Sequence, residues 1–249
     1  MPRPMQLRTA GVCLLALCLT AAFAASASAK SVTATLRVVG AGKVQLAEGE
    51  IKSPDISVKT SKQATCFGSG TGGSGKSASL MGNTALGLLA NGSKSIGKLR
   101  PLSITDHFSF GLGLCGIGQS KAKGESSWYV KINHKGTTVS ANKAKIKAGD
   151  EVLFDLAPSY PYPDELVVAA PEEATAGVPF TVHVYAYNEK GKRKPVKGAA
   201  VTGAIGPTDS QGKVSITLTK PTALIAGLRE DIPSAAVPVC LAGQCPAGS

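Results

Sequence analysis

The sequence WYVKINHKGTTV at residues 128–139 is the part of this chain that decides its fold class. Polar and apolar side chains alternate from Trp128 to Asn133, residues His134–Gly136 have the composition of a turn, and Thr137–Val139 resumes the extended pattern. Alternation with a period of two is typical of a strand with one buried face, and a turn between two such runs predicts a hairpin. We therefore expect a β-sheet at the centre of this region.

The residues before and after this hairpin predict further short strands and one helix. An apolar stripe near helical spacing predicts a helix from Ser79 to Asn91, with Asn91-Gly92 as its stop. The segment Leu99–Gly118 is irregular and apolar, and we expect it to fill the core and to include a strand. The other predicted strands of this half are Val32–Val39, Lys43–Leu46, Ile56–Thr60 and Glu151–Leu156.

A proline-rich joint divides the chain. Pro158, Pro161 and Pro163 follow one another closely, as is typical of a domain boundary. Beyond the joint, short extended runs are separated by turn residues at the spacing of a β-sandwich. These runs are Leu166–Val168, Phe180–Tyr187, Ala200–Thr202, Val214–Leu218 and Ala223–Ala226. We therefore predict a mainly β protein with one domain at residues 30–157, a linker at 158–163 and a second domain at 164–249.

The first 29 residues have the pattern of a secretory signal peptide. Arg3 and Arg8 make a basic start, an apolar run extends from Gly11 to Ala25, and the small residues Ala27–Ala29 predict cleavage before Lys30. The apolar run is too short, and too rich in small residues near its end, to predict a membrane anchor. We therefore expect a secreted or cell-surface protein without a transmembrane anchor.

Cleavage would leave four cysteines, namely Cys66, Cys115, Cys240 and Cys245. An even number of cysteines in an exported chain predicts disulfides, and four cysteines allow three pairings. We favour Cys66–Cys115 and Cys240–Cys245, because each pair then lies within one predicted domain. A metal site is the competing hypothesis, but the cysteines lack paired C-x-x-C spacing and nearby histidines, so we expect no metal.

The chain is basic, with 27 Lys and Arg against 16 Asp and Glu. Loss of Arg3 and Arg8 with the signal peptide would lower the formal charge from +11 to +9. A basic surface attracts anionic polymers. A solvated, lysine-rich surface is the simpler interpretation, because no row of aromatic residues for base stacking accompanies the charge. We therefore expect no specific nucleic-acid partner.

Residues Gly70–Ser77, with the sequence GTGGSGKS, match the nucleotide-binding pattern G-x-x-x-x-G-K-[ST] in full. Val152–Asp155 also imitates the apolar strand and aspartate that accompany such a loop. A phosphate-binding loop follows a buried parallel strand, however, and Lys62–Cys66 before this loop is polar and ends in a cysteine expected to form a disulfide. A Gly/Ser/Lys-rich segment can produce the pattern by composition, so nucleotide-dependent activity is a minor alternative.

The sequence predicts no other catalytic site. His107, His134 and His183 are far apart, and no G-x-S-x-G turn presents a nucleophilic serine. His183 alternates with Val182 and Val184, so we expect it to face solvent or an interface. We predict a protein that is not an enzyme and that uses no cofactor.

The first half resembles a domain of unknown function that is similar to the C-terminal domain of transcobalamin. The matching elements are Trp128-Tyr129 and Asn133 in the hairpin, Gly149-Asp150 before the closing strand, and Cys66 ahead of the predicted helix. The resemblance covers residues 32–157 and implies a β-grasp-like α+β fold. It also implies an alternative function, the capture of a small ligand of corrinoid type. Trp128, Tyr129 and Asn133 are the candidate ligand contacts, although packing in the core beneath the helix is the favoured interpretation for Trp128.

The second half resembles the bacterial Ig-like domains of surface proteins. The resemblance rests on Pro195–Val201 and on Thr208–Val214, in which Asp209 can cap a tight turn and Gly212 can take a positive φ. Such domains act as spacers, adhesion modules or stalk units, which implies an Ig-like β-sandwich here. The two halves together predict a monomeric, non-catalytic binding or adhesion protein whose partner is an extracellular polymer or another protein.

Overall fold

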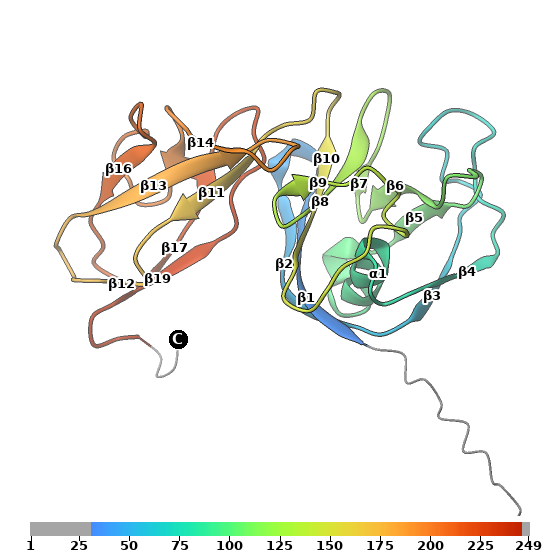
Figure 1. The fold of residues 1–249 in the computed structure, drawn as a ribbon, viewed down its shortest axis with the longest axis horizontal. Helices are drawn as coiled ribbons and strands as arrows, with labels where there is room; N and C mark the ends of the chain where they lie inside the picture. The colour runs from blue at the N-terminus through green and yellow to red at the C-terminus, as the bar shows by residue number, and fades with distance from the viewer. Residues whose placement is uncertain (1–30, 246–249) are drawn as a thin grey trace, which may run out of the picture.

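A computed structural model describes residues 31–245 of the chain (Figure 1). The predicted signal peptide at residues 1–29 lies outside the described residues. The described part is mainly β, as the sequence predicts, with mostly antiparallel sheets and one α-helix. Its buried hydrophobic residues form two main clusters, one within residues 34–154 and one within residues 166–241. We refer to residues 31–157 as the N-terminal lobe and to residues 164–245 as the C-terminal lobe.

The N-terminal lobe is built on a five-stranded sheet. Its strands in spatial order are β2 (Gln45–Ser53), β1 (Val32–Val39), β10 (Glu151–Ala157), β8 (Ser127–Ile132) and β9 (Lys135–Gly136). β1 and β10 pair in parallel, and the other neighbours are antiparallel. Val38 lies opposite Phe154, and Phe154 lies opposite Val130, so the strands place their alternate apolar residues on one face. The predicted hairpin is present as the β8–β9 pair at one edge of this sheet, but its turn is shorter than expected. The returning strand is Lys135–Gly136, within the predicted turn, and the predicted strand Thr137–Val139 is not formed.

The helix α1 (Ala85–Ser95) covers the apolar face of this sheet, but it begins later than the predicted start at Ser79. Thr84 sets the observed start, because its Oγ1 accepts a hydrogen bond of 3.2 Å from the Gly87 N–H and so caps the first turn. Residues Ser77–Leu80 form strand β4 instead.

The helix also continues beyond Asn91-Gly92, where the sequence predicts its stop. Asn91 is buried within the helix, and its Nδ2 donates to the backbone oxygens of Gly87 and Pro54. A Cβ at Gly92 would lie 2.6 Å from Leu36 Cδ2. The two residues therefore serve close packing of the helix on the sheet rather than helix termination.

Two smaller antiparallel sheets and two short 3₁₀ helices complete the N-terminal lobe. The segment 99–118, in which we expected one strand, contains the two strands of a hairpin, β5 and β6. The elements are β3 (Ile56–Lys59) paired with β4 (Ser77–Leu80), β5 (Leu102–Thr105) with β6 (Gly113–Ile117) and β7 (Ser120–Lys121), η1 (Ala41–Lys43) and η2 (Gly97–Leu99).

The C-terminal lobe consists of short strands that enclose the second hydrophobic cluster. One sheet contains β11 (Glu165–Ala169), β13 (Phe180–Tyr187), β14 (Arg193–Pro195) and β16 (Lys213–Ile216). The others contain β12 (Glu173–Ala174), β19 (Val237–Leu241) and β17 (Thr222–Leu224), and β15 (Ala200–Val201) with β18 (Ala226–Gly227). The tight turn predicted at Asp209 is present: its Oδ1 accepts from the N–H groups of Gln211 and Lys213, each at 2.8 Å, and Gly212 has a φ of +74°. No helix in residues 31–245 is long and apolar enough to span a membrane.

The second face of the five-stranded sheet carries charged residues and is covered by the C-terminal lobe. Strand alternation places Arg37 of β1, Lys131 of β8 and Asp155 of β10 on this face, opposite the one that packs on α1. Arg37 and Lys131 are each only 1% exposed, and Asp155 is fully buried. Figure 1 shows the sheet between α1 on one side and the C-terminal lobe on the other.

Glu165, the first residue of β11, supplies the negative charge that this face requires. Its carboxylate forms an ion pair with Arg37 and lies 3.3 Å from Lys131 Nζ. Lys131 Nζ also donates a hydrogen bond of 2.7 Å to the backbone oxygen of Tyr187, and Arg37 Nη1 donates one of 2.8 Å to that of Pro233. Both cations of the N-terminal lobe therefore contact the C-terminal lobe directly.

Burial alone would raise the pKa of Glu165, but three neighbours outweigh it. The His134 ring nitrogen at 3.2 Å and the charges of Arg37 and Lys131 hold the pKa of this carboxyl below its ordinary value of 4.5. A group whose pKa is lower in the folded state contributes stability that is complete above its unfolded value. That stability is lost as the pH falls through the lowered folded value.

We expect Glu165→Gln to lower the free energy of unfolding by about 3–5 kcal/mol at pH 7, the usual cost of removing one partner from a buried ion pair. Urea unfolding followed from pH 7 to below pH 4.5 should show this deficit shrinking, because the wild-type carboxylate loses its charge. The control is Glu172→Gln, an exposed glutamate of the same lobe, which should cost less than about 0.5 kcal/mol. Equal losses in the two variants would contradict the role of Glu165.

Candidate functional site

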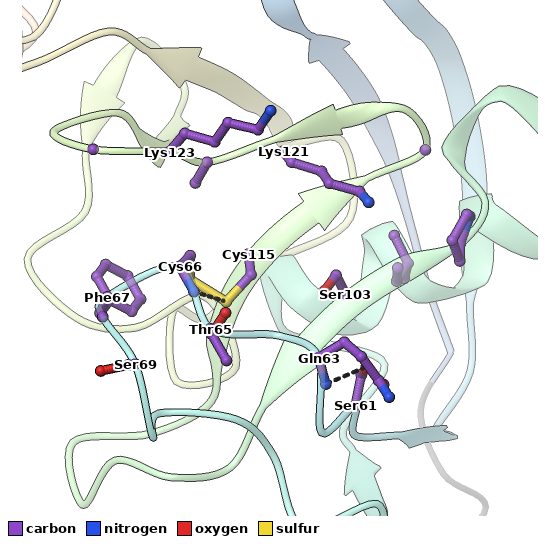
Figure 2. Close-up of a pocket in the computed structure, with 16 residues that line it drawn as sticks. Ser61, Gln63, Thr65, Cys66, Phe67, Ser69, Ser103, Cys115, Lys121 and Lys123 are labelled. Atoms are coloured by element: carbon purple, nitrogen blue, oxygen red, sulfur yellow. Dashed lines mark hydrogen bonds between the residues drawn. A yellow bond between two sulfur atoms is a disulfide. The ribbon is translucent and has the colours of Figure 1, made fainter.

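A groove with a volume of about 1110 Å³ lies beside the Cys66–Cys115 disulfide. One wall is the loop 61–69, and the other is the segment 118–124, which contains β7. Figure 2 shows the disulfide between these two walls, with Ser103 of β5 beside it. We call this depression the disulfide groove.

Cys115 of β6 is connected to both walls of the groove. The disulfide joins the loop 61–69 to Cys115, whose backbone oxygen also accepts a hydrogen bond of 2.9 Å from Ala122 in the opposite wall. The second disulfide, Cys240–Cys245, lies in the C-terminal lobe. These are the two pairs that the sequence analysis favours, and two disulfides indicate an oxidising environment.

The disulfide groove presents polar groups that have no partner within residues 31–245. The hydroxyls of Thr65, Ser69 and Ser103 and the ammonium groups of Lys121 and Lys123 form no side-chain hydrogen bond or ion pair there. In Figure 2 the Lys121 side chain extends from its wall toward the opposite one. Histidine, aspartate and glutamate, the usual general acids and bases, are missing from the lining. The groove therefore presents hydroxyl and ammonium groups that can form hydrogen bonds and ion pairs with a polar ligand.

Phe67 lies where the disulfide groove meets a second, smaller depression of about 190 Å³, which we call the Trp128 pocket. The Phe67 ring packs edge to face on Phe108, and Phe108 stacks on Phe110 with ring centroids 4.9 Å apart. Gly113 on β6 leaves room for this packing, because a Cβ there would lie 3.3 Å from Phe67 and 3.4 Å from Phe108. Phe67 and Phe110 remain 50% and 55% exposed. Exposed apolar rings that gather beside a groove are typical of a contact surface.

Two of the three ligand contacts predicted from the sequence, Trp128 and Tyr129, line the Trp128 pocket. Trp128 is partly buried against the core of the N-terminal lobe, and its buried Nε1 has no hydrogen-bond partner in the described structure. Tyr129 lies on the other face of the sheet and stacks on Tyr162 with centroids 4.0 Å apart. Burial, with the nearby Glu189, raises the pKa of Tyr129 to about 12, so its phenol stays neutral at physiological pH.

The third predicted contact, Asn133, lies outside both depressions. It occupies the turn after β8 with a φ of +48°. Its Nδ2 donates to Asp150 at 2.9 Å, and its Oδ1 accepts from the Glu151 N–H at 2.9 Å. Asn133 therefore ties the β8–β9 turn to the start of β10.

The segment Gly70–Ser77 has a structural role that explains its glycines. It leads into strand β4, whereas the nucleotide-binding pattern requires a helix at this point. A Cβ at Gly72 would collide with the backbone oxygen of Lys62, and one at Gly73 would lie 2.9 Å from Thr60 Cβ. Asp155, which imitates the accompanying aspartate, lies at the lobe interface 3.3 Å from Lys43 Nζ. The geometry does not support a nucleotide site here.

The two clusters of potential metal ligands in residues 31–245 are engaged in other interactions. His134, Glu151 and Glu165 have ligand atoms within 4.8 Å of one another, but Arg37 forms ion pairs with both carboxylates. A metal ion would have to displace a buried guanidinium. The second cluster, Glu173 with Cys240 and Cys245, has both sulfurs in a disulfide. Neither donor set fits a metal.

His183 is half-buried on the outer face of β13, between the buried Val182 and Val184, as its alternation predicts. Its ring lies nearly parallel to that of Tyr185, at an interplanar angle of 14°. His107 lies beside Phe108, and His134 stacks on Tyr187 at the lobe interface. The three histidines belong to three different environments and form no common site.

No protein-family model matches this sequence, and no curated protein matches it. The function therefore has to be inferred from the geometry and chemistry of the disulfide groove.

The sequence analysis did not identify Phe67, Phe110, Lys121 and Lys123 as members of one surface. Phe67 precedes a glycine-rich loop, and Lys121 and Lys123 lie in a charged turn. Phe110 belongs to the apolar segment Leu99–Gly118, which was expected to fill the core, whereas the structure leaves it 55% exposed. The predicted Cys66–Cys115 disulfide was the available signal, because it brings together residues 49 positions apart. The residues that flank both cysteines are the ones that form the groove.

We expect replacement of both Cys66 and Cys115 by Ala to lower the free energy of unfolding by about 4 kcal/mol, from the entropy of the loop that the bond closes. The matched control replaces Cys240 and Cys245 by Ala, and its shorter loop predicts a loss of about 2 kcal/mol. Urea unfolding of both variants gives the comparison. A larger loss in the Cys240/Cys245 variant would show that loop entropy does not govern these bonds.

Proposed function

We propose that this chain is an exported, non-catalytic binding protein and that an extended polymer binds along the disulfide groove. The predicted signal peptide and the two disulfides support export into an oxidising compartment. The unpartnered hydroxyl and ammonium groups of the groove support binding. The lack of carboxylates and imidazoles in its lining argues against catalysis.

The observation that carries the proposal is the position of Phe67. It lines both the disulfide groove and the Trp128 pocket and leaves half of its surface exposed. A ligand that contacts Phe67 can therefore extend in either direction, toward Lys121 in the groove or toward Phe110 beside the pocket. A polymer uses such a continuous surface better than a compact small molecule does.

The fold supports the finer assignments made from the sequence. A sheet in the order β2-β1-β10-β8-β9, with parallel central strands and one helix on one face, supports the β-grasp-like domain of transcobalamin type. The antiparallel strands around the second core support an Ig-like sandwich. In this proposal the C-terminal lobe acts as a rigid support that presents the groove.

The capture of a small ligand of corrinoid type is the second candidate, because two of the contacts predicted for it, Trp128 and Tyr129, line the Trp128 pocket. Its volume of about 190 Å³ is small, since pockets that enclose a drug-sized ligand measure about 300–1,000 Å³. A thermal-shift comparison of cobalamin with soluble polysaccharides separates the two candidates. Stabilisation by cobalamin alone, lost in Trp128→Ala, would favour the small ligand.

We expect Phe67→Ala combined with Phe110→Ala to weaken polymer binding about tenfold, because exposed aromatic residues supply much of the contact energy of a binding surface. Affinity electrophoresis in gels that contain neutral or acidic polysaccharides measures the effect. Ile205→Ala removes a fully exposed apolar residue of the C-terminal lobe and should leave binding unchanged. If both variants migrate like the wild type in every gel that retards it, Phe67 and Phe110 are not part of the binding surface.

A further inference from the structure

The net positive charge of the chain lies in the N-terminal part, because the positive and negative residues of the C-terminal part are equal in number. Residues 30–163 contain 17 Lys and Arg against 8 Asp and Glu, whereas residues 164–249 contain 8 of each. The formal charge of +9 that remains without the signal peptide therefore lies entirely on the part that holds the disulfide groove. Charge separated in this way indicates an anionic partner for the N-terminal lobe.

Part of that charge is gathered at the disulfide groove. Lys121 and Lys123 line it, and two further cations, Lys62 and Arg100, adjoin lining residues in the sequence without lining the groove themselves. All four side chains are exposed, and none forms an ion pair within residues 31–245. The lining contains two lysines and no carboxylate, so its formal charge is positive.

We infer that the polymer is an anionic polysaccharide, a chain of sugar rings that bear carboxylate or phosphate groups. This inference rests on the proposed function and specifies its ligand. Lys121 and Lys123 would meet the anionic groups, the hydroxyls of Thr65, Ser69 and Ser103 would exchange hydrogen bonds with ring hydroxyls, and Phe67 would pack on the apolar face of a ring.

A nucleic acid is the other polyanion that a basic groove can hold, and the lining argues against it. Sequence-independent binding of single strands relies on successive aromatic side chains that stack successive bases. The lining of the disulfide groove has one aromatic residue, Phe67, whereas its free hydroxyls on Thr65, Ser69 and Ser103 can exchange hydrogen bonds with ring hydroxyls. A polysaccharide therefore uses more of the groove than a nucleic acid does.

Two matched pairs of polymers test the inference on residues 30–249. Polygalacturonate is compared with its fully methyl-esterified form, and a phosphomannan with its dephosphorylated form, by isothermal titration at low and moderate salt. A single-stranded DNA oligonucleotide is included as a polyanion without sugar-ring faces free for contact. The variants are Lys121→Gln/Lys123→Gln and the control Lys52→Gln/Lys94→Gln, which removes the same charge from exposed positions in β2 and α1 outside the groove.

We expect at least one anionic form to bind at least about tenfold more tightly than its neutral counterpart, with an affinity that falls as salt rises. The pair that shows this identifies carboxylate or phosphate as the recognised group. Lys121→Gln/Lys123→Gln should lose about tenfold in affinity, and the Lys52/Lys94 control less than about twofold.

Equal binding of charged and neutral forms, unaffected by Lys121→Gln/Lys123→Gln, would overturn the inference and leave the proposed function standing. Equal losses in the two lysine variants would also overturn it, because the attraction would then come from net charge and not from the groove. DNA bound more tightly than either anionic glycan would assign the groove to nucleic acid. Failure of all four polysaccharides to bind would overturn the proposed function together with the inference.

Discussion

The buried carboxylate of Glu165 is the constraint on which the arrangement of the two lobes depends. Arg37 of β1 and Lys131 of β8 lie on either side of Leu153 of β10 on one sheet face, where each is almost completely removed from water. Burial lowers the pKa of Lys131, and the charge of Glu165 opposes that shift. Without Glu165, two cations would lie in the interface with too little negative charge to stabilise them. The C-terminal lobe is therefore required by the chemistry of the N-terminal sheet and is more than an appended module.

This arrangement limits where a ligand can bind. The helix α1 covers one face of the five-stranded sheet and the C-terminal lobe covers the other, so neither face is free. The remaining surface of the N-terminal lobe includes the loops around β5, β6 and β7, where the Cys66–Cys115 disulfide ties the loop 61–69 to β6. Binding residues on loops that a rigid scaffold positions are a common solution in proteins. The disulfide groove fits that description.

The sequence was sufficient to predict features that depend on local spacing. The alternation of residues 128–133, the turn at Asp209 and the two disulfide pairs all appear in the structure. The predicted C-terminal end of the helix is wrong because Asn91-Gly92 is a typical sequence for helix termination. In the structure Asn91 instead donates to the Pro54 backbone oxygen, and Gly92 allows close packing against Leu36. Arg37 and Lys131 alternate as surface residues do, and periodicity cannot show that another lobe covers them. Phe67 was missed for a similar reason, since its partner Phe108 lies on a separate loop.

The lobe interface also determines where the excess charge of the protein lies. Arg37, Lys43 and Lys131 are matched there by Glu151, Asp155 and Glu165, three cations to three anions. The cations and anions at the interface are equal in number. The excess of Lys and Arg over Asp and Glu in the N-terminal lobe therefore lies mainly on its solvent-facing surface, which includes Lys121 and Lys123 of the disulfide groove. Like charges that repel one another across such a surface cost stability unless a partner neutralises them. A polyanion in the disulfide groove would relieve that repulsion while leaving the buried ion pairs between the lobes undisturbed.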